Sequence, residues 1–255
     1  MPHSVDIIGS YAQDISPYFP IPSRLLPYVP TSTKSPISPA FQNFVTTLHD
    51  RYKSKGSELL VLFEDLDSIT AYFSRENDRS AGKIWQDSIL VQLRINPLIH
   101  RLLCAESVRH ESSLDEKQKD YLIVSESCRL AALLYLATLR RRAGLLPVRT
   151  VCQLTKLKTK FENDCVDWTE LQNLRLWALT LGAVEASAIS DRTWFVDRIA
   201  IRMRDLGAVR RDQIDTSLQS LVKCDDIYEN ALRRLGRDVH QSLTAFDNPH
   251  DTCKK

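Results

Sequence analysis

Glycine is scarce in this sequence, with 7 residues among 255. Nucleotide-binding α/β folds depend on glycine-rich phosphate loops, so the scarcity argues against that class, and it excludes collagen. Hairpin signals are missing as well, because neither an N-G nor a D-G dipeptide occurs and no segment alternates apolar and polar residues. A net charge of +2 argues against a strongly basic nucleic-acid binder and against an acidic tail.

The sequence shows neither a targeting signal nor a membrane span. Its N-terminus carries no basic stretch followed by an apolar one, and its longest uncharged apolar run covers only residues 130–139. A membrane-spanning helix needs about 20 such residues. We therefore expect an intracellular protein with reduced thiols and no membrane contact.

The cysteines do not have the spacing of metal ligands. No C-x-x-C pair occurs, although six thiols is the number that a binuclear zinc cluster uses. The six are Cys104, Cys128, Cys152, Cys165, Cys224 and Cys253. The histidines are scattered too, and no G-x-S-x-G element frames a serine nucleophile. We expect no zinc, no cofactor and no catalytic residue.

Proline divides the chain into two compositional parts. Eight of the eleven prolines lie at or before Pro39, and proline disrupts helices through its missing N–H and its effect on the preceding residue. Residues 1–39 are therefore predicted to be a Pro-rich extended arm or linker. Residues 40–245 are predicted to form one all-α domain, and residues 246–255 a disordered tail.

Apolar residues after Pro39 recur with a helical period. Phe41, Phe44 and Leu48 fall on one face, and similar stripes continue along the chain. Asn96-Pro97 predicts the start of a new helix, and residues 130–139 form the expected centre of the core. The fold is predicted to be an irregular multi-helix bundle of about nine or ten helices with short loops.

Two passages carry a resemblance to a known family. They are ESCRLAALLYL (residues 126–136) and LWALTLGA (residues 176–183), and the second is followed by DRTWF (residues 191–195). In order and spacing they resemble the fungal-specific transcription factor domain, the helical regulatory region downstream of zinc binuclear cluster modules. The zinc cluster itself is missing from this sequence, as is a tryptophan expected near Val222-Lys223-Cys224.

The resemblance singles out six family-signature residues: Glu126, Arg129, Trp177, Gly182, Arg192 and Trp194. We expect structural roles for all of them. The i,i+3 spacing of Glu126 and Arg129 predicts an ion pair. The two tryptophans should bury their rings between helices, Gly182 should allow two helices to approach closely, and Arg192 should bind an acidic group or a helix C-terminus.

The resemblance implies a non-enzymatic nuclear protein that controls transcription through protein contacts or a sensed small molecule. Its partner would be a DNA-binding relative or a second copy of the chain. Because the zinc cluster is missing, the chain alone should not bind DNA specifically. An orphan scaffold fragment is one alternative.

The second alternative is an all-α isoprenoid-class enzyme, since Asp225, Asp226 and Glu229 match D-D-x-x-E, a pattern that can hold Mg²⁺. A helix start explains these acids more simply. Basic clusters occur at residues 140–142 and at Lys156, Lys158 and Lys160. We interpret them as solvated helix ends in preference to phosphate contacts or a nuclear-import signal.

Overall fold

The computed structural model describes residues 2–20, 39–52, 57–105, 115–145, 148–162, 166–221 and 225–247. Within these ranges the chain forms ten α-helices, one short 3₁₀ helix and no strand. The predicted all-α class is thereby confirmed. Residues 21–38 of the predicted arm and residues 248–255 of the predicted tail lie outside the described residues, whereas residue 39 and residues 246–247 are helical.

The chain divides into two compact units, Met1–Leu171 and Gln172–Lys255. This differs from the single domain predicted for residues 40–245. The boundary falls in the short connection before α7, where the sequence offers no cluster of proline or glycine to mark it. We refer to the two parts as unit 1 and unit 2.

Unit 1 contains six α-helices and the 3₁₀ helix. They are α1 (Pro2–Gln13), α2 (Pro39–Tyr52), α3 (Ser57–Ser80), η3 (Lys83–Gln86), α4 (Ser88–Cys104), α5 (Glu116–Arg142) and α6 (Val151–Glu162). The extended arm predicted for residues 1–39 is wrong for α1. Pro2 is its first residue, a position where proline favours a helix because the missing N–H would have no partner anyway. Ile7 and Tyr11, one turn apart, bury the inner face of α1.

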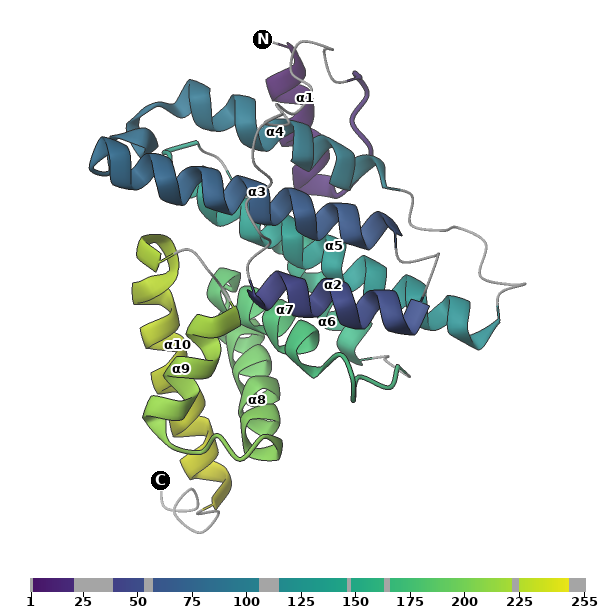
Figure 1. Cartoon of the computed structure of the whole chain (residues 1–255), viewed down its shortest axis with the longest axis vertical. Helices are drawn as coiled ribbons and strands as arrows, with labels where there is room; N and C mark the ends of the chain where they lie inside the picture. The colour runs from purple at the N-terminus through teal and green to yellow at the C-terminus, as the bar shows by residue number, and fades with distance from the viewer. Residues whose placement is uncertain are drawn as a thin grey trace. The chain divides into compact units, whose positions relative to one another are not determined.

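The longest helix, α5, forms the core of unit 1, as the sequence predicts. It packs against α3, α4 and α6 (Figure 1), and every residue from Leu130 to Ala137 is buried. Asp115 and Gln118 close its N-terminus with a reciprocal capping box. Gly144, with φ 68°, ends it in the left-handed conformation that glycine favours.

The helix start predicted at Asn96-Pro97 is wrong. Asp87 caps α4 by accepting a hydrogen bond from the Leu90 amide, and the helix then runs through Pro97 to Cys104. Val91, Ile95 and the apolar residues after Pro97 are buried in one stripe. This burial outweighs the loss of one backbone hydrogen bond at the proline.

Unit 2 contains four helices: α7 (Gln172–Glu185), α8 (Ile189–Asp205), α9 (Arg211–Leu221) and α10 (Asp225–Asp247). Helix α8 packs against α7 and α10, and α9 packs against α10 (Figure 1). Buried apolar residues recur every three or four positions along the inner face of α10: Tyr228, Leu232, Leu235, Val239 and Leu243.

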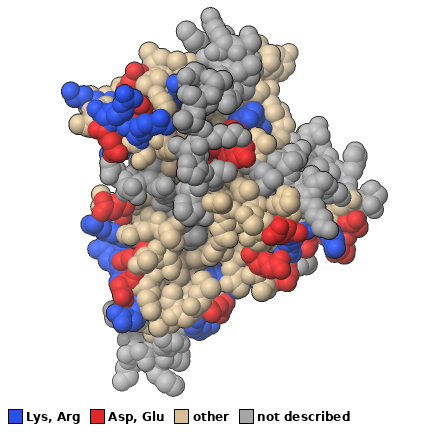
Figure 2. Space-filling view, in the orientation of Figure 1, with Lys and Arg blue, Asp and Glu red and all other residues tan. Residues whose placement is uncertain are grey.

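The charged side chains do not collect into one field on the face that Figure 2 shows. Basic and acidic groups are interspersed there, with uncharged surface between them. This agrees with a net charge of only +2. Anion binding on this face would therefore depend on a local arrangement.

Candidate functional site

Arg129 connects separate helices of unit 1 through its guanidinium group. Nε and Nη2 donate to the two carboxylate oxygens of Glu126 at 2.7 Å each. Nη1 and Nη2 donate to the carboxylate of Asp14 at 2.8 Å each, and Nη1 also donates to the Leu102 carbonyl at 3.2 Å. All five N–H groups are thus used, as a buried guanidinium requires. The predicted Glu126–Arg129 pair is confirmed as part of a larger network.

Asp14 completes this network directly after α1. Its backbone is left-handed, with φ 52°, a conformation that aspartate tolerates better than most residues. Its side chain is fully buried and also accepts a hydrogen bond from Lys156 of α6. Burial alone would raise the pKa of Asp14, but hydrogen bonds from Arg129 and Lys156 hold it below its usual range. We call Asp14, Glu126, Arg129 and Lys156 the Arg129 network.

Gly182 lies where α7 and α8 cross in unit 2. A Cβ atom built on it would stand 2.5 Å from Cε1 of the Phe195 ring, closer than real side chains come. The glycine therefore allows a fully buried phenylalanine to lie directly on the α7 backbone. The expected close helix approach is confirmed.

Arg192 joins three helices of unit 2. From the first turn of α8 its Nη1 donates to the Ala183 carbonyl at 2.7 Å, near the end of α7. Its Nη2 donates to the carboxylate of Asp238 on α10 at 2.7 Å. The side chain thus binds both kinds of group expected from the sequence, an acid and a helix C-terminus.

The two signature tryptophans differ in burial. Trp177 is completely buried, as predicted. Trp194 is only half-buried, and the guanidinium of Arg198 lies over its ring at 5.2 Å from the centroid. The prediction of a buried Trp194 is wrong because the helical register turns its neighbour Phe195 into the core instead.

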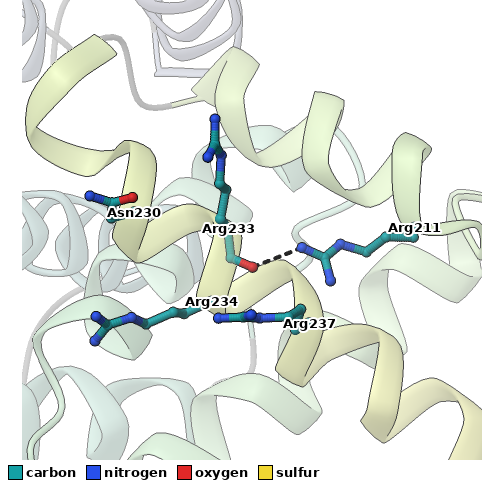
Figure 3. A pocket seen from close by; sticks show the side chains of 5 residues that line it. All are labelled: Arg211, Asn230, Arg233, Arg234 and Arg237. Atoms are coloured by element: carbon teal, nitrogen blue, oxygen red, sulfur yellow. Dashed lines mark hydrogen bonds between the residues drawn. The ribbon is translucent and has the colours of Figure 1, made fainter.

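A hollow with a basic lining lies between α9 and α10 in unit 2. It measures about 380 Å³, and its lining contains four arginines and an asparagine: Arg211, Asn230, Arg233, Arg234 and Arg237. Figure 3 shows Arg211 reaching from α9 to the main-chain oxygen of Arg233, a hydrogen bond of 2.8 Å. We call the four arginines the arginine face.

Only half of the arginine face is neutralised. Arg211 pairs with Asp215 at 2.9 Å, and Arg233 pairs with Glu229. Arg234 and Arg237 are exposed, and no acidic side chain of the described residues bonds either of them. Sequence reasoning missed this surface, although Asn230 and the three α10 arginines follow the i, i+3, i+4, i+7 spacing of one helix face.

The acids of the D-D-x-x-E pattern stand at the start of α10. Asp225 and Asp226 are its first residues, as the helix-start interpretation predicts, and their side chains lie outside the described residues. The carboxylate of Glu229 is bound by Arg233.

The basic cluster at the end of α5 is only partly the solvated helix end that we expected, because Arg142 is exposed but Arg140 is buried. Arg140 is 4% exposed, and its Nη1 donates to Asn96 at 2.9 Å. The amine of Lys156 belongs to the Arg129 network. Arg140 is therefore an internal structural group, whereas Lys156 is an exposed side chain whose amine binds the buried carboxylate of Asp14.

The cysteines that the structure describes are unpaired: Cys104 is exposed, Cys152 is half-buried and Cys128 is buried. The described residues contain no group of three or more His, Cys, Asp or Glu that could hold a metal ion. The three other cysteines lie outside the described residues. One described helix, α5, is long and apolar enough to cross a membrane, but 72% of its most apolar window is buried, as in a core helix.

Comparison of the chain with models of protein families, with curated proteins and with solved structures finds no match.

Proposed function

We propose that this chain is a non-enzymatic regulatory domain of the fungal-specific transcription factor type, which acts in the nucleus through protein contacts. The observation that supports the proposal is the position of the resembling residues. Glu126 and Arg129 tie together the helices of unit 1, whereas Gly182 and Arg192 tie together those of unit 2. Residues at these positions would hold the helices of a regulatory scaffold together.

The arginine face gives such a scaffold a surface for a partner. Arg234 and Arg237 stand one turn apart on the exposed face of α10, without acidic partners among the described residues. Guanidinium groups bind carboxylates through paired hydrogen bonds, and an uncompensated positive patch accelerates encounter with an acidic surface. The partner we propose is an acidic segment of a DNA-bound protein.

DNA contact is assigned to that partner. Specific readout requires a rigid element in a groove with several side chains on base edges, and the relatives that the sequence resembles place this in a zinc cluster. We expect the isolated chain, titrated with random and genomic DNA pools at physiological salt, to show weak, salt-sensitive binding without enrichment of one sequence.

A tethered reporter tests the proposal. The full chain is fused to an unrelated DNA-binding domain whose site lies upstream of a reporter gene. The fusion should change transcription of the reporter, and Arg234→Gln with Arg237→Gln should abolish the change. The control, Arg202→Gln with Arg204→Gln, removes two charges from α8 and should retain it. A fusion that leaves transcription unchanged while present at normal levels would contradict the proposal.

A further inference from the structure

A second hollow, of about 370 Å³, lies within unit 1. The exposed turns of α1 form one wall, and α4, the end of α5 and the segment before α6 form the rest. Its lining includes Ile7, Ile8, Gly9, Ile99, Arg140 and Arg149. The volume is within the range of small-molecule sites, which begins at about 300 Å³.

Arg140 is a buried cation without a counter-ion in the described part of the chain. It is 4% exposed, and its one described hydrogen bond goes to the neutral side chain of Asn96. Tyr11 beside it uses its hydroxyl to donate to the Leu133 carbonyl at 2.7 Å, and burial raises the pKa of Tyr11, so the phenol is neutral. Burial disfavours the charge on Arg140, yet a guanidinium stays protonated in proteins.

The free energy needed to bury the unpaired charge of Arg140 points to a ligand that neutralises it. A buried charge is ordinarily paired, because desolvation without a partner is expensive. Arg129, on the same helix, shows the paired alternative, with two carboxylates on one guanidinium. The hollow in front of Arg140 is where an equivalent carboxylate can enter.

The other lining residues favour a ligand with an apolar body. Ile99 is fully buried, Ile7 is nearly so, and Ile8 lies half-exposed beside them. The position that a Cβ atom of Gly9 would occupy has no neighbouring atom within 4 Å, so this wall is open. Arg149, an exposed residue of the lining, adds a second positive charge.

We propose that this hollow binds a small amphipathic carboxylate. Its head group forms paired hydrogen bonds with Arg140, and its hydrocarbon body lies against the isoleucines of α1 and α4. One carboxylate neutralises the charge of one buried guanidinium. A neutral ligand would leave that charge uncompensated. The role of this ligand as an effector of transcription rests on the proposed function. Its binding to the isolated chain does not depend on that function.

The test is calorimetric titration of the purified full chain with octanoate, against butanoate and octanol as matched probes. Octanoate should bind at one site per chain and more tightly than either. Affinity should rise about fourfold for each added methylene until the hollow is full. Octanol binding as tightly as octanoate, or no saturable binding of octanoate, would overturn the proposal.

Two variants locate the site independently. Gly9→Leu adds a large side chain at a residue that lines the hollow, where a Cβ atom meets no neighbour within 4 Å, and it also favours the helix. Arg140→Met removes the buried charge. Each should weaken octanoate binding at least about tenfold, as expected for loss of a charged hydrogen bond or of the binding space. Arg142→Met, at the exposed end of the same helix, should have no effect.

The Gly9→Leu result stands even if Arg140→Met fails to fold. A folded Gly9→Leu chain with unchanged octanoate affinity would overturn the assigned location. Intact octanoate binding combined with an inactive tethered fusion would count against the proposed function alone. An active fusion without octanoate binding would count against this site alone.

Discussion

Asp14 and Arg129 lie 115 residues apart in the sequence and share two parallel hydrogen bonds of 2.8 Å. The pair fastens α1 to α5, and Glu126 and Lys156 complete a network of two acids and two bases. Its members carry no net charge together, so burial does not leave an unbalanced ion. Glu126 and Arg129, two of the six signature residues, therefore have a structural explanation.

Replacement of Asp14 by Asn should destabilise unit 1 strongly. The change leaves Arg129 and Lys156 short of one negative charge in a buried site, and such losses cost about 3 kcal/mol or more. Urea denaturation followed by circular dichroism would measure the loss. Asp78→Asn, at an exposed position of α3, is the matched control and should change the free energy of unfolding by less than about 0.5 kcal/mol.

The same variant should reveal the pH dependence of the network. Because folding lowers the pKa of Asp14, its stabilising effect is complete above the unfolded pKa of about 3.9 and is lost as the pH falls through the folded pKa. The stability difference between the native chain and Asp14→Asn should thus be constant near neutral pH and shrink below about pH 4. A difference that does not change in acid would contradict this explanation.

Gly182→Ala should destabilise unit 2 by about 1–3 kcal/mol, because its new methyl group meets the Phe195 ring. Gly182→Ala should cost less free energy of unfolding in a chain that already carries Phe195→Leu than in the native chain. A thermodynamic cycle over the four proteins measures this coupling. Additive losses would show that the two residues do not constrain each other.

The two signature tryptophans should respond differently to truncation. Trp177→Ala removes a completely buried ring and should cost about 3–5 kcal/mol. Trp194→Ala removes a half-buried ring that stacks on Arg198, and it should cost less than half as much. Equal losses in denaturant titrations would contradict the burial difference.

Local patterns predicted most of the fold, whereas long-range partners could not be read from the sequence. The continuous apolar run at residues 130–139 located the core segment of α5, and i,i+3 spacing predicted the Glu126–Arg129 pair. No local signal shows that Asp14 is the second carboxylate on Arg129, because the two meet only after the helices pack. The prediction of an extended arm is wrong for α1 because proline disrupts the interior of a helix but favours its first position, where Pro2 lies.

The two candidate binding surfaces also combine features that the sequence shows with features that only the structure shows. The spacing of Asn230, Arg233, Arg234 and Arg237 was visible in the sequence as one helix face, and the missing acidic partners required the structure. Arg140 looked like a solvated residue within a run of three arginines. Its burial follows from the rotation of α5, which turns Arg140 inward and leaves Arg142 exposed.

Chromatin immunoprecipitation of the tagged full chain, in the cells that express it, tests the central claim most directly. If the chain is a transcriptional regulator recruited by a DNA-bound partner, it should be enriched at discrete promoters. Enrichment should fall when Arg234 and Arg237 are both replaced by Gln and persist in the Arg202→Gln, Arg204→Gln control. A well-expressed chain without enrichment at any promoter would contradict the account.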